Sequence, residues 1–422
     1  MKKILVISLS FPPHSNAGTW RPFKLTKLIA TLGWLPFVLT TAIGCKDDAD
    51  SLLEKNLPSD LQIVRVGCSN PWLHIKIWYI RYRTGLKKYA AKLIFNIIYR
   101  TRIRFPLDEH YLWAIRIAGK GESLVRQHSI DLIWATAPSL SVLYAAFLIA
   151  LKTGVPYVID YRDVFPKKSS GHYTAKLEQR IVSSAAGVSY TSPAQGKVLL
   201  DKFPCIVNKP HCLIYNWFDQ SEINSLPIIK KKCFTIIHGG YLYAGIRCMN
   251  SFFEALSCIK STTWGKSQNV TFYNYGFYQD LSYLTTLKSR YSLHDTVKLR
   301  KKVPRNTFLS LCKGADILLV VVGHDTDLHV NSLPSKLYEY FSACRPILVI
   351  GPDNSEAAHM VLKINRGIAV SDSKPEQIVG AIKLLSQGLG VNGKLDLSIE
   401  AVSEFTSEAA RQKISQFFSL IT

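Results

Sequence analysis

The sequence has 422 residues, of which 47% are hydrophobic and 19% are charged. This composition excludes a disordered chain, and the length favours two globular domains over one. The net charge of +22 is uneven, since residues 1–215 hold 29 Lys and Arg against 13 Asp and Glu. Such an excess indicates an anionic partner, with a merely solvated basic surface as the alternative.

The spacing of the cysteines and the length of the apolar stretches exclude several classes of protein. The nine cysteines are scattered singly and none forms a C-x-x-C pair, which argues against a disulfide framework or a zinc site. The longest largely apolar stretch, residues 140–151, is shorter than the ~20 residues that a membrane-spanning helix needs. We therefore expect a reduced cytosolic protein without a transmembrane segment.

Apolar, β-branched runs alternate with helical patterns through the first half of the chain. Candidate strands are residues 4–9, 36–40, 61–66, 132–135, 157–160 and 187–190, and candidate helices include 21–32 and 139–152. This alternation predicts parallel β-α-β units with most strands buried on both faces.

The loop after the first strand is a candidate anion site. The small residues Ala17 and Gly18 would let backbone N–H groups approach an anion at the start of the next helix, with Arg21 nearby. The loop is neither G-x-G-x-x-G nor a P-loop, so an ordinary helix cap is the alternative.

Residues 71–107 interrupt the alternation. They contain nine basic residues and no acidic one, interleaved with Trp, Tyr and Phe. This pattern is typical of an interfacial amphipathic helix on an anionic membrane, and the absence of acids favours that interpretation over a solvated helical hairpin. No zinc-finger or RRM signature accompanies the charge, which argues against nucleic acid.

The strand at 157–160 ends in charged side chains. Asp160, Arg162 and Asp163 are functional candidates, because charges at the end of a buried strand are costly unless they are paired or used. A structural Arg-Asp pair is the alternative. We favour Asp163, which lies farthest past the strand.

A second α/β series follows a predicted joint at residues 216–232. Candidate strands are 235–238, 270–275, 297–299, 317–321, 347–350 and 367–370, with helices at 250–260, 336–343 and 403–421. The first strand leads into His238, Gly239 and Gly240, where adjacent glycines would let the backbone approach a ligand. Arg247 follows, and its guanidinium suits a diphosphate.

The strongest signal is the segment P-S-K-L-Y-E-Y at residues 334–340. We expect Ser335 to be the N-cap of a helix whose first turn, with Lys336, faces a diphosphate. Glu339 could accept hydrogen bonds from two ribose hydroxyls. A capped amphipathic helix with Glu339 in solvent is the less favoured alternative.

At this point the sequence resembles the GT-B glycosyltransferases of family 4, in particular those that build bacterial surface polysaccharides. Five segments carry the resemblance: F-P-P-H-S-N-A-G-T-W-R-P (11–22), D-Y-R-D-V-F (160–165), N-W-F-D (216–219), G-G-Y-L-Y-A-G-I-R (239–247) and P-S-K-L-Y-E-Y-F-S-A-C-R-P-I-L (334–348). The family often has two glutamates eight positions apart. The position before Glu339 is Asn331 here, which can still hydrogen-bond a sugar hydroxyl but lacks the charge.

The resemblance implies two Rossmann-like domains facing across a cleft. Residues 1–215 would form the acceptor domain, with the insertion 71–107, and residues 216–402 the nucleotide-sugar domain. The helix at 403–422 would cross back to the first domain. No cofactor or bound metal is implied, and the donor would be a nucleoside diphosphate sugar.

The resemblance also implies roles for individual residues in a retaining transfer. Arg247 and Lys336 would stabilise the departing diphosphate, and Asp163 is the third catalytic candidate, facing the reacting sugar or acceptor. The donor site would be lined by Gly18, His238, Gly239, Gly240, Asn331, Ser335 and Glu339.

These patterns lead to one main hypothesis and two alternatives. The main one is a glycosyltransferase acting on a lipid-linked glycan in surface polysaccharide synthesis, at the cytoplasmic face of the cell membrane, with residues 71–107 docking on the anionic surface. A nucleotide-sugar epimerase of the same fold is the first alternative. A non-enzymatic anion-binding protein that uses residues 71–107 is the second.

Overall fold

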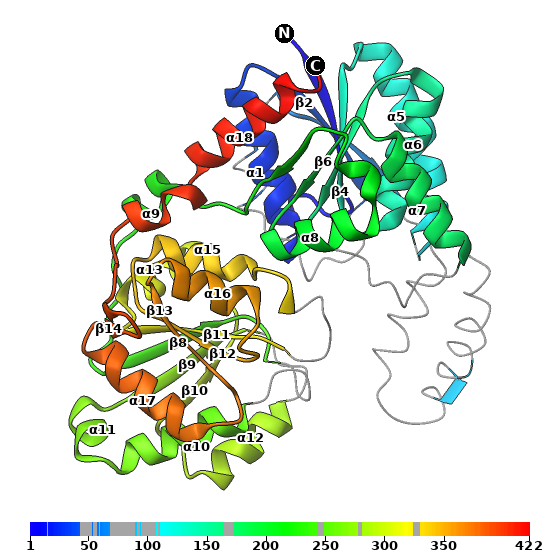
Figure 1. Cartoon of the computed structure of the whole chain (residues 1–422). Coiled ribbons are helices and arrows are strands. Elements are labelled where there is room, and N and C mark those ends of the chain that lie inside the picture. Colours follow the sequence, from blue (N-terminus) through cyan, green and yellow to red (C-terminus); the bar gives the residue numbers. More distant parts are fainter. Residues whose placement is uncertain are drawn as a thin grey trace. The chain divides into compact units, whose positions relative to one another are not determined.

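A computed structural model describes residues 1–14, 16–42, 53, 57–58, 60–67, 89–90, 93, 107–108, 110–163, 172–242, 249–276, 281–323 and 330–422. The chain divides into two compact units (Figure 1). The first consists of Met1–Ile214 with Arg411–Thr422, and the second of Tyr215–Ala410. The predicted joint at residues 216–232 therefore lies within the second unit. The basic segment 71–107 lies outside the described residues, apart from residues 89, 90, 93 and 107.

The first unit is built on a seven-stranded parallel sheet in the order β3-β2-β1-β4-β5-β6-β7. Its strands are β1 (Lys3–Ile7), β2 (Leu35–Thr41), β3 (Gln62–Val66), β4 (Leu132–Ala137), β5 (Tyr157–Tyr161), β6 (Gly187–Tyr190) and β7 (His211–Leu213). The short edge strand β7 was not predicted, because its three half-buried residues carry no apolar run. The other six lie within two residues of the predicted ranges.

Helices cover both faces of this sheet, which is why its central strands are apolar on both sides. They are α1 (Ala17–Thr31), α5 (Tyr111–His128), α6 (Leu140–Thr153), α7 (His172–Ser184), α8 (Pro193–Lys202), the 3-10 helix η4 (Pro204–Ile206) and α18 (Ser407–Ser419). The helices α5 and α6 pack against each other and enclose the main core of this unit.

Most of the C-terminal helix α18, from Arg411 onward, belongs to the first unit. The ring centroids of Phe417 and Phe418 lie 6.1 and 5.8 Å from that of Trp134, and Phe418 also contacts Trp34 at 4.9 Å. Gly187 leaves room for this packing, since a Cβ there would lie 2.8 Å from the Phe417 ring.

The predicted helix at 403–421 is interrupted in the structure. A 3-10 helix, η5 (Glu400–Phe405), precedes α18, and Thr406 between them is extended. The cause is a short strand-like contact, because Phe218 donates its N–H to the Phe405 carbonyl and accepts one from Ser407.

The second unit is built on a six-stranded parallel sheet in the order β10-β9-β8-β11-β12-β13. Its strands are β8 (Thr235–Gly239), β9 (Thr271–Tyr275), β10 (Val297–Arg300), β11 (Ile317–Val321), β12 (Ile347–Ile350) and β13 (Gly367–Val370), with a small hairpin of β14 (Leu389–Gly390) and β15 (Gly393–Lys394). All six were predicted to within one residue at each end.

The helices of the second unit again cover both faces of the sheet. They are α9 (Gln220–Ser225), α10 (Asn250–Ser261), α11 (Thr263–Gln268), α12 (Leu281–Arg290), α13 (Arg305–Gly314), α15 (Ser335–Ser342), α16 (Glu356–Lys363) and α17 (Pro375–Ser386). The helices α10 and α17 pack together over one face of the sheet and contribute to its main core.

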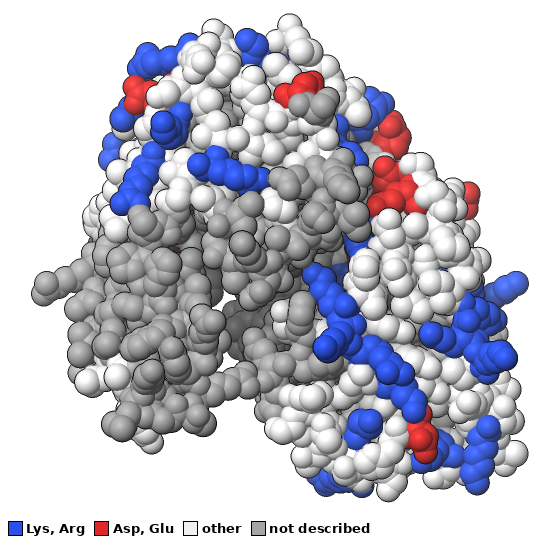
Figure 2. All heavy atoms as spheres, turned by 180° about the vertical axis from the view of Figure 1, so that it is seen from behind, with Lys and Arg blue, Asp and Glu red and all other residues white. Residues whose placement is uncertain are grey.

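The positive charge of the sequence is visible on the described surface, where blue Lys and Arg side chains outnumber red acidic ones (Figure 2). Part of it lies in the second unit, where Lys288 of α12 and Lys298 of β10 repel each other. Burial, followed by the neighbouring Lys298, lowers the pKa of Lys288 below its ordinary value. Every helix in the described ranges is too short or too polar to cross a bilayer.

Candidate functional site

The predicted donor residues of the second unit gather where β8 ends and α15 begins. His238 is fully buried near the end of β8, and the sheet register places it beside Asn274 of β9. The His238 Nδ1 lies 2.6 Å from the Asn274 Oδ1. The carboxyl ends of strands in open α/β sheets are where ligands bind.

Of the two glycines after His238, Gly239 ends β8 and Gly240 forms the turn that follows it. The Gly239 N–H donates to the Tyr340 hydroxyl of α15 at 2.9 Å, and the Gly240 N–H donates to the Tyr275 carbonyl at 2.8 Å. Gly240 has φ +108°, in the region that favours glycine. A Cβ there would lie 3.4 Å from the Lys336 Nζ, so the turn runs directly under this ammonium group.

Lys336 lies in the first turn of α15 and points back to the end of β8. Its Nζ is 2.8 Å from the His238 Nε2. A cation beside a glycine turn and a helix start is an arrangement that suits a phosphate group.

The prediction that Ser335 is the N-cap of this helix is wrong by one residue. The helix begins at Ser335, and Pro334 precedes it as the cap residue, with φ −58°, ψ 135° and no side-chain cap hydrogen bond. The pyrrolidine ring fixes the φ of Pro334, so the chain turns into the helix without a capping side chain. Ser335 is exposed in the first turn.

Glu339, one turn further along α15, is held by an arginine that the sequence did not single out. Its Oε1 accepts from the Arg305 Nε at 3.0 Å, and Arg305 also pairs with Glu222 of α9. Burial alone would lower the pKa of Arg305, but the two carboxylates outweigh it and raise the pKa. The predicted ribose ligand is thus oriented by an ion pair.

Two further predicted residues stand apart from this group. Asn331 is half-buried four residues before α15. Arg247 lies outside the described residues. The described part of the chain therefore brings together His238, Gly239, Gly240 and Lys336.

In the first unit, Asp160 and Arg21 form a buried ion pair. The Arg21 Nε and Nη2 donate to the two Asp160 oxygens at 2.8 and 2.7 Å, and Thr136 and Ser189 donate at 2.9 and 2.7 Å. Burial alone would raise the pKa of Asp160, but Arg21 and the two hydroxyls outweigh it and lower the pKa below its ordinary value. Arg21 is a core residue in this structure, and the prediction that it accompanies an anion at the helix start is wrong.

The first loop is tied to the end of β5. The Gly18 N–H donates to the Asn16 side chain at 2.9 Å, which makes Asn16 the helix cap. The Gly18 carbonyl accepts from the Arg162 Nη1 at 2.6 Å. The Gly18 N–H that was expected to face an anion is therefore used by the cap, and Arg162 holds the loop in place. Asp163 is half-buried beside Arg162.

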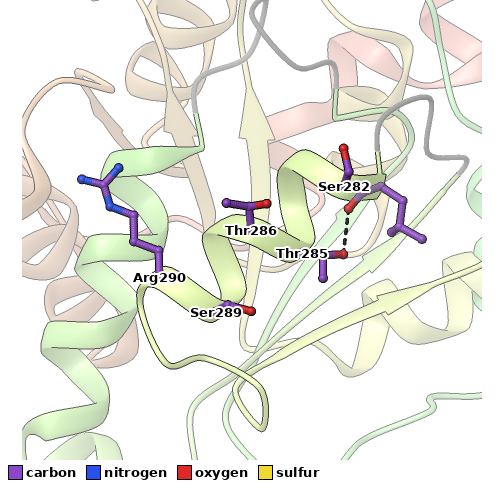
Figure 3. Close-up of a pocket in the computed structure, with 6 residues that line it drawn as sticks. Ser282, Thr285, Thr286, Ser289 and Arg290 are labelled. Carbon is purple, nitrogen blue, oxygen red and sulfur yellow. Dashed lines mark hydrogen bonds between the residues drawn. The ribbon is translucent and has the colours of Figure 1, made fainter.

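A shallow hollow of ≈ 640 Å³ lies on α12, lined by Leu281, Ser282, Thr285, Thr286, Ser289 and Arg290 (Figure 3). The Thr285 hydroxyl is occupied within its own helix, since it donates to the Leu281 carbonyl at 2.8 Å. None of the residues singled out in the sequence lines this hollow. Within the described ranges, no three His, Cys, Asp or Glu side chains come together in a group that could hold a metal ion.

Comparison with known proteins gives a likeness of fold. No protein-family model matches the sequence, and no curated protein matches it. HepE from Anabaena, solved with UDP, superimposes with a TM-score of 0.64 at 13% identity, covering 99% of this chain and 100% of that one. Sucrose-phosphate synthase from Thermosynechococcus elongatus gives 0.67 at 12% identity, covering 99% and 98%.

The apo form of the lipopolysaccharide outer core galactosyltransferase WaaB gives a TM-score of 0.59 at 11% identity, covering 99% of each chain. At such identities the likeness establishes the fold alone. The predicted α/β class with two parallel-sheet units, the GT-B fold class, is confirmed over the whole chain.

Proposed function

We propose that this chain is a retaining glycosyltransferase of the family 4 type, which transfers a sugar from a nucleoside diphosphate donor to a glycan in surface polysaccharide synthesis. The observation that carries the proposal is the position of Lys336. Its ammonium group lies over the Gly240 turn at the carboxyl edge of the sheet and at the start of α15. The names of the similar structures, a UDP complex, a sucrose-phosphate synthase and a galactosyltransferase, support the same reaction class.

The proposed chemistry is the breaking of the bond between the anomeric carbon and the diphosphate oxygen. The diphosphate leaves with the electron pair, the acceptor hydroxyl oxygen forms the new bond on the same face of the sugar, and the hydroxyl proton passes to the departing diphosphate. Lys336, Arg247 and the first turn of α15 would stabilise the departing charge, which makes a bound metal unnecessary.

The remaining candidates would bind and orient the reactants. Glu339 would accept hydrogen bonds from the ribose hydroxyls, with Arg305 keeping its carboxylate in place. Asn331 would bind a sugar hydroxyl, and Ser335 would lie at the phosphates. Gly18 and Asp163 would face the reacting sugar or the acceptor.

Replacing Lys336 tests the proposal. A panel of nucleotide sugars, screened by thermal shift, identifies the donor through the rise in apparent stability on binding. With that donor and a lipid-linked acceptor, we expect Lys336→Met to lower kcat/KM roughly 100-fold, the effect of removing one stabilising group. The matched control is Lys363→Met, an exposed lysine of α16.

Normal turnover by Lys336→Met would contradict the assignment of the donor site. Formation of an isomeric nucleotide sugar without any acceptor would instead indicate an epimerase.

We also propose that the acceptor is lipid-linked and that residues 71–107 bring the enzyme to the anionic inner surface of the cell membrane. The support is the charge of that segment, with nine basic residues, no acid and abundant aromatic side chains.

A further inference from the structure

Three side chains form a chain of contacts from the interior of the second unit to its candidate site. Asn274 of β9 and His238 of β8 are both fully buried. The His238 Nδ1 lies 2.6 Å from the Asn274 Oδ1, and its Nε2 lies 2.8 Å from the Lys336 Nζ. The imidazole is therefore in contact on both ring nitrogens.

The protonation of the ring follows from the groups that it contacts. An ammonium group can only donate, so the Nε2 of His238 must be the acceptor of the Lys336 bond. The one ring hydrogen is then on Nδ1, where the Asn274 oxygen accepts it. The other neutral form would place two donors face to face at Nε2, and an imidazolium would set two like charges 2.8 Å apart.

We propose that Asn274 is a positioning residue, which fixes the neutral Nδ1–H form of His238 and through it the place of Lys336. The inference rests on the proposed function, because Lys336 is the proposed phosphate ligand. The Asn274 oxygen accepts from Nδ1 and fixes the orientation of the ring. The Nε2 of the ring accepts one hydrogen of the ammonium group, and this bond keeps the Nζ over the Gly240 turn. Four rotatable bonds of a lysine side chain would otherwise spread its charge over many positions.

The unliganded protein gives the first test. In the full chain labelled with ¹⁵N-histidine, the ring of His238 is identified in long-range ¹H–¹⁵N spectra by comparison with His238→Gln. We expect a protonated Nδ1 and an unprotonated Nε2 at neutral pH. A protonated Nε2, in either a neutral or a charged ring, would overturn the inference.

The variant Asn274→Asp gives the second test. A carboxylate opposite Nδ1 favours the imidazolium, which can no longer accept from Lys336. We expect both ring nitrogens to be protonated and the affinity for UDP, measured by calorimetry, to fall about tenfold, as for the loss of a hydrogen bond to a charged group. The matched control is Asn392→Asp, an exposed residue with the same change of charge.

The outcomes separate the two proposals. Unchanged UDP affinity in a folded Asn274→Asp protein would refute the positioning role. No binding of UDP or of any other nucleotide by the native protein would refute the proposed function, and the ring spectrum of the unliganded protein would still decide the state of His238. If Asn274→Asp does not fold, the native spectrum and the UDP affinity of His238→Phe decide the question. The ring of that variant has no acceptor for Lys336, and we expect its UDP affinity to fall about tenfold for the lost hydrogen bond.

Discussion

The ion pairs of the two units differ in their exposure to solvent and therefore in their role. Arg305 links Glu339 to Glu222, so an acid that could bind ribose is oriented before any ligand arrives. Arg21 and Asp160 are instead enclosed completely, with relative side-chain exposures of 3% and 0%. This enclosed pair joins α1 to β5, the Thr136 and Ser189 hydroxyls link Asp160 to β4 and β6, and the pair presents no charge to a ligand.

This difference leads to a prediction for Asp160. The change Asp160→Asn leaves the Arg21 charge buried without its partner, and we expect the free energy of unfolding of the first unit to fall by about 3–5 kcal/mol. The control Asp201→Asn alters an exposed residue of α8 and should have little effect. Denaturant unfolding at pH 7 measures both.

The same pair gives a pH dependence with a definite sign. Because the folded-state pKa of Asp160 is lowered, its stabilisation is complete above the ordinary carboxyl pKa of about 4 and is lost as the pH falls through the folded-state value. The native protein should therefore lose this contribution below about pH 4. An Asp160→Asn variant that is as stable as the native protein at pH 7 would contradict the role of the pair.

The sequence identified some of these residues and missed others for a physical reason. Lys336 and Glu339 stand in a local segment whose spacing is itself the signal. Arg305 and Asn274 act through contacts with residues 34 and 36 positions away. A hint was present in Asn274, since an amide in an otherwise buried strand needs a hydrogen-bond partner.

At the scale of elements, the long apolar strands were predictable because burial on both faces leaves a continuous signal. The exact residue at which each helix starts was less predictable. The helix α1 begins at Ala17, four residues before the predicted start, because Asn16 caps it, and Pro22 lies inside the helix. The break at Thr406 depends on Phe218, almost two hundred residues earlier, and has no local signal.

The turn at Gly240, directly after β8, leads to a prediction for stability and for UDP binding. Gly240→Ala would place a side chain at φ +108° and 3.4 Å from the Lys336 Nζ. We expect a loss of about 1–3 kcal/mol in stability from backbone strain. We also expect weaker UDP binding, because the new methyl group would lie in contact with the ammonium, in the space over the turn where we propose that a phosphate binds.

A matched control separates these two effects. Gly393 has a similar φ of +100°, but a Cβ there meets nothing within 4 Å. Gly393→Ala should lose stability and keep its UDP affinity. Equal affinities in the two variants would contradict a site at Gly240.

For the whole molecule, the two-sheet architecture followed from the alternation of strands and helices. The assignment of the last residues to the first unit depends on tertiary packing, in which Phe417 and Phe418 cover Trp134. The basic segment 71–107 is the basis of the proposal that the protein associates with a membrane.

The membrane proposal predicts a salt-sensitive association with anionic liposomes. Neutralising Lys87, Lys88 and Lys92 to Gln should weaken partitioning at low salt roughly 100-fold, at about 1 kcal/mol for each lysine. Neutralising Lys363, Lys374 and Lys383, which are exposed in the second unit, is the control with an equal change of net charge. Co-sedimentation of the full chain measures both, and equal losses would argue for a nonspecific charge effect.

Because α18 packs on the first unit, it determines the order in which the two units can fold during translation. Because Arg411–Thr422 completes a unit that begins at Met1, the aromatic rings of Trp34 and Trp134 lack their Phe418 partner until the ribosome has read past the entire second unit. The second unit, in contrast, is one uninterrupted stretch of chain and can fold as soon as it emerges. A nascent chain stalled before residue 411 would therefore carry a finished second unit beside a first unit with an uncovered apolar face, the kind of surface that chaperones bind.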